Sequence, residues 1–419
     1  MPCVLKSVFL RTLSGTSLFA IVVLVLCGRV SAQTGMASGT VAFRNATLET
    51  MGPDGRMENA TLVIRDGKII AAGVNADVPD DARLVDATGK TIMPGIVDPY
   101  FVFNNQGGNG GGRRGSLRRL SEYFYPYEVN WVPFSRSGIT TANLVQSGTG
   151  QSAVAQIVPS DLENLLLKPD GFLFATVTNQ TASLNFVRNG LKPPTASGRR
   201  RSRGRDRSEE SPFDMTSAPV QDQSDQQEQE GENTTDTAEL WNQVRAGDQP
   251  LFVNVNNTAT VLHLLKALGD HEAVKVAMVC SGSNLYEVMG ELSSRKITLI
   301  LQPGIDNVPY TSERVNIARM ALDNNVPFVF SFSLNRGQLN AHQDDPMFVI
   351  SMLVKSGLPR EAALQAVTIG PAKLIGMEET LGSLEENKQA NLLIFDGDPL
   401  ETGSRLEQVM VEGRTVHEN

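Results

Sequence analysis

Cysteine and histidine are scarce in this sequence, and the scarcity limits both its cross-linking and its chemistry. The 419 residues include three cysteines and four histidines. Cys3 and Cys27 fall within a predicted leader, so Cys280 is the single cysteine of the remaining chain. One cysteine cannot form an internal disulfide, and stability must therefore come from the core. Cys280 has no histidine beside it in sequence, which favours a small buried residue over a nucleophile. A Gly-x-Ser-x-Gly elbow in triad order is also absent from the sequence.

Residues 1–32 have the pattern of a signal peptide. Lys6 and Arg11 precede an apolar run from Leu18 to Cys27, and Val30-Ser31-Ala32 resembles a cleavage site before Gln33. The alternative is an uncleaved anchor, but the uncharged stretch is shorter than the roughly 20 residues that a spanning helix needs. Cys27 follows Leu26, which disfavours a lipoprotein site. We therefore expect a periplasmic or extracellular protein, in contact with a membrane only if the segment stays uncleaved.

The chain is acidic, with a formal net charge of −9. The predicted leader carries three basic residues and no acidic one, so the mature chain is more acidic still. Such a surface argues against nucleic acid as the main partner.

The remaining sequence divides into a β-rich start and a longer α/β region. Residues 33–94 contain short strands, with a hairpin predicted at 61–73 around Asp66-Gly67. From residue 95 to 372, apolar runs typical of parallel strands alternate with helical stretches, which predicts a (β/α)₈ barrel. Helices are expected at 312–324 and 359–367. Only seven strands are recognisable, and we expect the eighth between 180 and 250. The seven are predicted at 95–103, 140–145, 172–178, 251–256, 274–281, 297–302 and 326–333.

Two segments interrupt this pattern. Residues 107–112 are nearly all glycine, but they lack the Lys-Ser/Thr of a phosphate-binding loop, which favours a flexible loop. Residues 193–238 begin basic and become acidic and glutamine-rich, a composition that predicts a disordered insertion. A binding arm is the alternative reading of this insertion.

Several ordered motifs resemble the amidohydrolase superfamily, in the branch similar to imidazolonepropionases. Met93-Pro94-Gly95-Ile96-Val97-Asp98 resembles the first barrel strand of that family. The run from Ala390 to Leu400 and the closing run from Val409 to Arg414 resemble its returning β-strands. The resemblance implies a TIM-like barrel and a small composite β-sandwich, built from residues 33–94 and 373–419. It also implies a hydrolase in which a divalent ion, often zinc, activates a water.

The residues at the family's metal positions do not match that chemistry. The family has His-x-His two residues after the strand-1 aspartate, whereas Asp98 is followed here by Tyr100 and Val102 at those positions. Asn254 stands at the strand-5 histidine position. At strand 6 the position is held by Cys280 or Ser281, and at strand 8 Ser333 replaces the aspartate. Asp98 itself is expected to survive as a residue beside the metal position. We therefore predict no metal and no other cofactor.

The four histidines do not restore a site. His263 and His271 belong to a predicted helix and its end, and His417 lies near the C-terminus. Only His342, near Asp344 and Asp345 after strand 8, is placed to reach the barrel mouth, and one histidine is far weaker than a four-ligand site. A surface loop is the simpler reading for His342.

Three functions follow from these observations. The leading prediction is an exported amidohydrolase-family protein without the catalytic metal, which binds a small molecule at the barrel mouth or a protein partner such as an active relative. The second is a hydrolase of non-peptide carbon–nitrogen bonds with a rebuilt site, which would contain zinc or another divalent metal. The third is a cell-envelope interaction protein that acts through the charged insertion.

Overall fold

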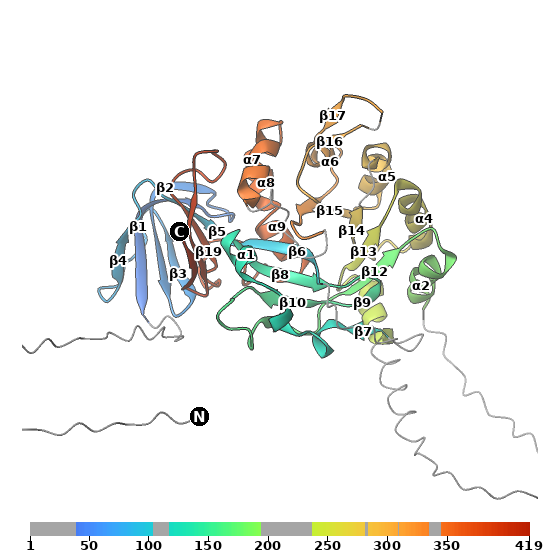
Figure 1. Ribbon diagram of the computed structural model, residues 1–419, viewed down its shortest axis with the longest axis horizontal. Helices are drawn as coiled ribbons and strands as arrows, with labels where there is room; N and C mark the ends of the chain where they lie inside the picture. Colours follow the sequence, from blue (N-terminus) through green and yellow to red (C-terminus); the bar gives the residue numbers. More distant parts are fainter. Residues whose placement is uncertain (1–38, 104–116, 194–236, 281–283, 309, 335–344) are drawn as a thin grey trace, which may run out of the picture. The chain divides into compact units, whose positions relative to one another are not determined.

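The structure is a computed structural model that describes residues 39–103, 117–193, 237–280, 284–308, 310–334 and 345–419 (Figure 1). The predicted leader, the glycine-rich stretch and most of the charged insertion lie outside these residues. Within the described part, none of the helices has the length and apolar character needed to cross a membrane.

Two stretches from opposite ends of the chain build one eight-stranded sheet. Its order is β21-β20-β19-β5-β1-β2-β3, with β4 beside β1. Strand β5 joins the two contributions, because Ile92 lies opposite Ile394 in its antiparallel pairing with β19. Apolar side chains from both contributions pack in one buried cluster. The composite β-domain expected from the sequence is therefore present. Its strands are β1 (Thr40–Glu49), β2 (Arg56–Arg65), β3 (Lys68–Gly73), β4 (Arg83–Asp86), β5 (Thr91–Pro94), β19 (Leu392–Phe395), β20 (Leu406–Val411) and β21 (Arg414–Glu418).

The predicted hairpin is confirmed between β2 and β3. The two strands are antiparallel and are joined by Asp66 and Gly67. Both residues have positive φ, 48° and 79°, which Asp and Gly adopt more readily than most residues.

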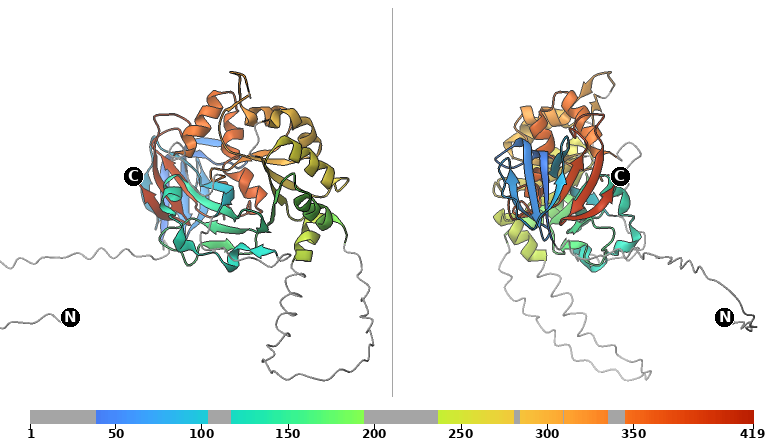
Figure 2. Two further views of the ribbon diagram at one scale, coloured as in Figure 1. Left: turned by 45° about the vertical axis from the view of Figure 1, so that its right-hand side comes forward. Right: turned by 90° about the vertical axis from the view of Figure 1, so that its left-hand side faces the viewer.

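Parallel strands form the α/β region. Ladders join β12 to β13, β13 to β14, β14 to β15 and β15 to β18, and a separate parallel ladder joins β6 to β8. The seven predicted strands all appear among them, and Figure 1 labels β12, β13, β14 and β15 as neighbours in this region. Figure 2 gives two further views. Their bounds are β6 (Ile96–Val102), β8 (Ile139–Val145), β12 (Leu173–Val177), β13 (Leu251–Val255), β14 (Val276–Cys280), β15 (Thr298–Leu301) and β18 (Phe328–Phe330).

The eighth position of the ring is filled from an unexpected place. Strand β10 (Ala153–Gln156) pairs antiparallel with β8, and β9 (Thr149–Gln151), two residues earlier, pairs antiparallel with β12. The segment 149–156 therefore bridges the two parallel groups. The strand expected between 180 and 250 is not found in the described parts of that stretch, which form helix α2 (Thr181–Leu191) and a helix at 237–246. Residues 194–236 lie outside the described residues. Four further short strands are described. Strands β7 (Arg118–Arg119) and β11 (Leu166–Lys168) extend the sheets, and β16 (Asp306–Asn307) pairs with β17 (Arg314–Val315).

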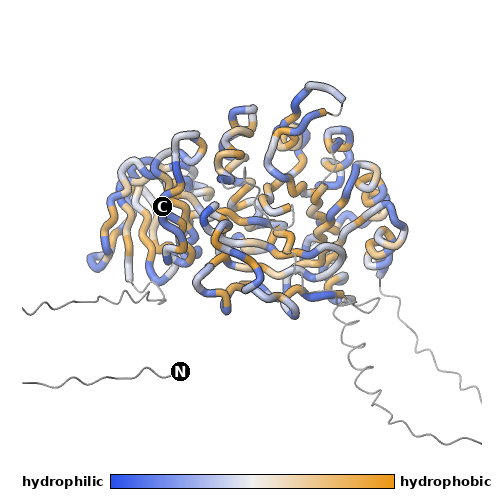
Figure 3. Tube along the Cα trace, viewed as in Figure 1, coloured by the Kyte–Doolittle hydropathy of each residue, from blue (hydrophilic) through white to orange (hydrophobic). Residues whose placement is uncertain are grey.

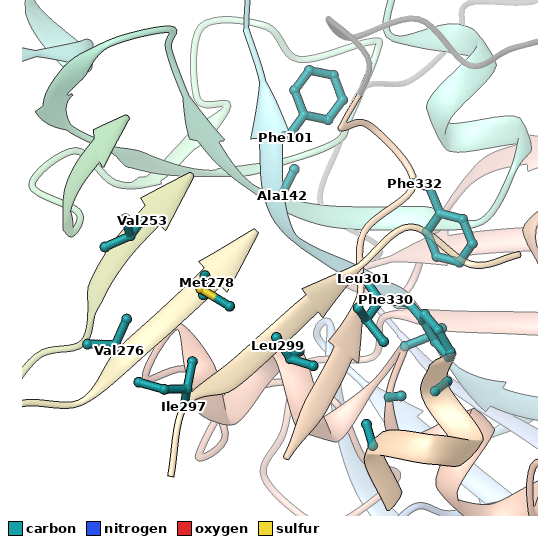
Figure 4. Close-up of a cluster of buried hydrophobic side chains, with 14 of the residues drawn as sticks. Phe101, Ala142, Val253, Val276, Met278, Ile297, Leu299, Leu301, Phe330 and Phe332 are labelled. Atoms are coloured by element: carbon teal, nitrogen blue, oxygen red, sulfur yellow. The ribbon is translucent and has the colours of Figure 1, made fainter. Parts of the chain in front are cut away.

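The parallel strands are buried on both faces, which explains their near-continuous apolar sequences. Outward side chains pack under the helices in one cluster, to which Val253, Met278, Leu299 and Phe330 belong (Figure 4). Inward side chains form a second cluster inside the ring. Figure 3 shows hydrophobic residues along the strands of this region.

Helices α4, α6 and α7 begin at polar capping residues. Asn257 accepts a 2.8 Å hydrogen bond from the backbone N–H of Thr260 at the start of α4, and Asp345 caps Phe348 in the same way at 3.1 Å. Asn316 caps α6, which starts at Ile317, five residues later than predicted, because residues 314–315 form β17. The prediction at 359–367 corresponds to α8. The helices are α1 (Val132–Arg136), α4 (Thr258–Leu268), α5 (Met289–Ser294), α6 (Ile317–Asp323), α7 (Pro346–Lys355), α8 (Arg360–Gln365) and α9 (Ile369–Leu374), and the 3₁₀ turns are η1 (Leu120–Glu122), η2 (Pro126–Glu128) and η3 (Leu285–Val288).

Gly95 connects the β-domain to the first barrel strand, and only glycine fits there. Its backbone N–H donates a 2.8 Å hydrogen bond to the carbonyl of Asn391. A Cβ atom at this position would lie 2.3 Å from Oγ1 of Thr140 on the neighbouring strand. The glycine of the Met93–Asp98 motif is therefore required by the close approach of β6 and β8.

Candidate functional site

Asp98 on β6 is a fully buried carboxylate that joins the first barrel strand to the last. Its Oδ1 accepts hydrogen bonds from the hydroxyl of Ser331 at 2.6 Å and from the backbone N–H of Tyr100 at 3.1 Å. Its Oδ2 accepts a 3.1 Å bond from the backbone N–H of Phe332. Both partners from the last strand lie just beyond β18. Asp98 therefore acts as a connection across the seam where the ring closes.

Burial raises the pKa of Asp98 above its ordinary value of 3.8, because an ionised carboxylate loses its hydration. The hydrogen bonds from Ser331 and the two backbone N–H groups favour the ionised form but do not offset the burial. Ser333 also lies close enough to favour ionisation. Its hydroxyl is buried and makes no hydrogen bond of normal geometry within the described part of the chain.

Tyr100 fills the first of the two family histidine positions and points into the ring. It is 1% exposed, and its ring lies 6.5 Å from that of Phe252 on β13. Its hydroxyl interacts with the side chain of Asn254, which stands at the strand-5 histidine position. Burial raises the pKa of Tyr100 strongly, so the phenol is neutral at physiological pH. Tyr100 and Asn254, which stand at two of the family's histidine positions, therefore interact with each other.

Val102, at the second histidine position, belongs to the same apolar interior as Tyr100. Phe174, Val279 and Ile300 reach this interior from three further strands. Helix α9 closes part of it with Ala372. The interior is therefore packed with hydrocarbon where the family would hold its ion.

The candidate residues on strands 6 and 8, Cys280 and Ser333, face different sides of the barrel wall. Cys280 packs against the outer cluster beneath the helices, so it faces away from the ring interior. Ser281, His342 and Asp344 lie outside the described residues. Ser333 faces inward, close to Asp98.

The ring interior also has a polar side that the sequence analysis missed. Thr141 and Gln156 are direct partners in the β8–β10 pairing, and both are buried. Within the described residues, Thr141 Oγ1 and Gln156 Nε2 have no hydrogen-bond partner. Asn143, on the same face, donates to the carbonyl of Pro99 at 3.1 Å but leaves its Oδ1 unpaired there. Alternating polar residues within the Ile139–Val145 run were the available signal.

These side chains do not fit a zinc ion. Val102 has no donor atom, and the phenol of Tyr100 and the amide of Asn254 are poor substitutes for imidazole. Across the described ranges, no group of three or more His, Cys, Asp and Glu side chains has a metal-binding arrangement. We therefore derive no reaction step that passes through a metal.

Comparison with known proteins finds relatives among the amidohydrolases. The model of the amidohydrolase family matches residues 351–417. Imidazolonepropionase of Porphyromonas gingivalis is 23% identical over 388 residues, which cover 83% of this chain and 86% of that protein. The enzyme of Thermoplasma volcanium is 25% identical over 82% of this chain and 85% of its own length. A stronger local match, 37% over 86 residues, spans only 20% of imidazolonepropionase from Agrobacterium fabrum.

Solved structures show the same fold. An amidohydrolase from Thermotoga maritima superposes with a TM-score of 0.65 at 17% identity, covering 90% of this chain and all of that one. A prolidase complexed with N-methylphosphonate-L-proline gives 0.52 at 14% identity, with coverage of 91% and 100%. The chain is therefore a relative of the amidohydrolases, similar to their family model over residues 351–417 and to the fold of their solved structures. Over most of its length its sequence is similar to imidazolonepropionases.

Proposed function

We propose that this protein is an exported, zinc-independent amidohydrolase relative that binds a ligand or partner instead of hydrolysing a substrate. One observation carries the proposal: Tyr100 and Val102, at the two strand-1 histidine positions, pack into the apolar interior of the ring. A side chain held in this way cannot turn toward an ion without unpacking the interior.

Hydrolysis of the family type needs a water whose pKa is lowered by an ion, and a base that removes its proton. The amide of Asn254 cannot act as that base. Asp98 is fully buried and accepts hydrogen bonds from Ser331 and Phe332. Its oxygens are therefore occupied by contacts between the first and last barrel strands. These features support a scaffold whose barrel no longer activates water.

The retained fold still offers a binding surface. In this architecture ligands bind at the carboxyl ends of the strands. We place the binding site of this protein at that end, where Ser333 lies. The bound species is a small molecule or the surface of a protein such as an active relative.

A hydrolase with a rebuilt site is the second candidate, and near full-length similarity to imidazolonepropionases favours it. The two candidates differ in metal content. The purified chain would be equilibrated with zinc, desalted and measured by inductively coupled plasma mass spectrometry, with a zinc-binding amidohydrolase treated in parallel. We expect less than about 0.1 zinc per chain, against about one for the control. A value near one, together with carbon–nitrogen hydrolysis that a chelator abolishes, would overturn the proposal.

Export is tested separately, by determining the N-terminus of the protein recovered from its source cells. We expect the mature chain to begin at Gln33. A chain that retains residues 1–32 in the soluble cell interior would contradict export but would leave the binding proposal standing.

A further inference from the structure

A cavity of about 220 Å³ lies where the end of helix α1, the start of helix α7 and strands β19 and β20 meet. Phe395 and Leu406 form part of its apolar wall. Its lining includes no residue of the apolar ring interior. It is therefore a different place from the site proposed above.

Two guanidinium groups line this cavity from different elements. Arg136 ends α1, and Arg405 directly precedes β20. Within the described residues neither side chain forms an ion pair or a hydrogen bond, and only the backbone N–H of Arg405 is bonded, to Asp396. Two exposed arginines that line one cavity and form no ion pair within the described residues favour an anion between them.

Polar groups of the cavity wall add to this preference. The hydroxyl oxygen of Ser404 is buried and has no hydrogen-bond partner in the described part of the chain. Asp345 contributes the one acidic side chain of the lining. Its carboxylate already accepts the N–H of Phe348 at the start of the ten-residue helix α7, whose dipole offsets part of its charge. The lining side chains thus carry a net positive charge.

We propose that this cavity binds a small oxyanion, the phosphate or carboxylate group of an organic molecule. The planar fork of an arginine matches the two oxygens of either group, and two arginines hold one oxyanion from two sides. The apolar wall at Phe395 then contacts the rest of the ligand.

Isothermal titration calorimetry of the full chain at low ionic strength tests this assignment, with inorganic phosphate and succinate as separate probes. We expect at least one probe to bind with a Kd below about 1 mM. Arg136→Gln and Arg405→Gln should each weaken that binding roughly tenfold. The probe that binds more tightly distinguishes a phosphate site from a carboxylate site.

Two matched variants separate this site from general charge effects. Lys355→Gln removes one positive charge from the C-terminal end of helix α7, away from the cavity at its start, and should leave binding unchanged. Asp345→Asn keeps a good helix-capping residue but removes the negative charge, so it should tighten binding. Each variant would be shown to be folded by its thermal unfolding. The assignment is overturned if neither probe binds at about 10 mM, or if the arginine variants bind as well as the unmodified chain.

Discussion

The hydroxyl of Ser331 donates a 2.6 Å hydrogen bond to Asp98 across the seam between the first and last barrel strands. No ladder pairs β6 with β18 among the described residues, so individual bonds close the ring there. The carbonyl of Ser333 also accepts a 3.4 Å bond from the N–H of Val102 at this seam. An aspartate that the family places beside a metal is used here to hold the barrel together.

Removing the acceptor should weaken the seam. Asp98→Asn replaces one carboxylate oxygen by an N–H₂ group, so the remaining oxygen can accept the bonds from Ser331 and Tyr100 or the bond from Phe332, but not both. We expect a loss of about 2–4 kcal/mol in the free energy of unfolding, measured by urea denaturation. Ser331→Ala removes one donor and should cost about 2 kcal/mol. Variants that unfold within about 0.5 kcal/mol of the unmodified chain would show that the seam is closed by other contacts.

The raised pKa of Asp98 gives stability a definite pH dependence. Protons bind the folded carboxyl more tightly than the unfolded one, so its protonation stabilises the fold at low pH. This contribution is fully present below the ordinary pKa of 3.8 and is lost as the pH rises through the higher folded value. The stability difference between the unmodified chain and Asp98→Asn should therefore shrink as the pH rises above the ordinary pKa of 3.8. Urea titrations at increasing pH measure it, and a difference that grows with pH would contradict the shift.

A four-residue ionic network connects the β-domain to helix α8. Glu49 on β1 is buried and is bonded by Arg56 at 2.7 Å and by Arg360 of α8 at 2.5 Å. Asp398 contacts the same two arginines, at 3.1 and 2.9 Å. Burial alone would lower the pKa of Arg360, but its bonds to Glu49 and Asp398 raise it.

Breaking this network at Arg360 should be costly, because Glu49 would keep its burial and lose one of its two cations. We expect Arg360→Met to lower the free energy of unfolding by about 2–4 kcal/mol. The double variant with Glu49→Gln should lose less than the sum of the two single variants, since their partners are shared. A double-mutant cycle by urea denaturation measures this coupling. Additive losses would show that the two side chains act independently.

The sequence predicted those parts of the fold that depend on local pattern. The strand at 251–256 was recognisable because four of the five residues of β13 are apolar. The bridge between β8 and β12 was not, because β9 and β10 have three and four residues and are interrupted at Ser152. Such short strands are held by their neighbours and leave little periodicity to read.

The candidate site was predictable only in part. The family motif located Asp98, Tyr100 and Asn254, and the structure brings all three into the ring. It could not indicate that Cys280 faces outward, because the inward direction depends on pairing with neighbouring strands. Ser331 was missed because the family pattern directs attention to Ser333. The bond from Ser331 to Asp98 joins residues 233 positions apart, which no local pattern encodes.

The unpaired hydroxyl of Thr141 gives the last prediction. The side chain is fully buried within the ring, and its Oγ1 has no partner in the described part of the chain. Thr141→Val keeps the shape and removes the polar atom, so it should raise the free energy of unfolding by about 1 kcal/mol. Thr140→Val is the matched control, because its Oγ1 donates to the carbonyl of Ile96 at 3.3 Å and its loss should destabilise the chain. Urea denaturation of both variants measures the contrast. If Thr141→Val were destabilised as much as Thr140→Val, the hydroxyl of Thr141 would have to be bonded to an internal water that bridges it to Gln156.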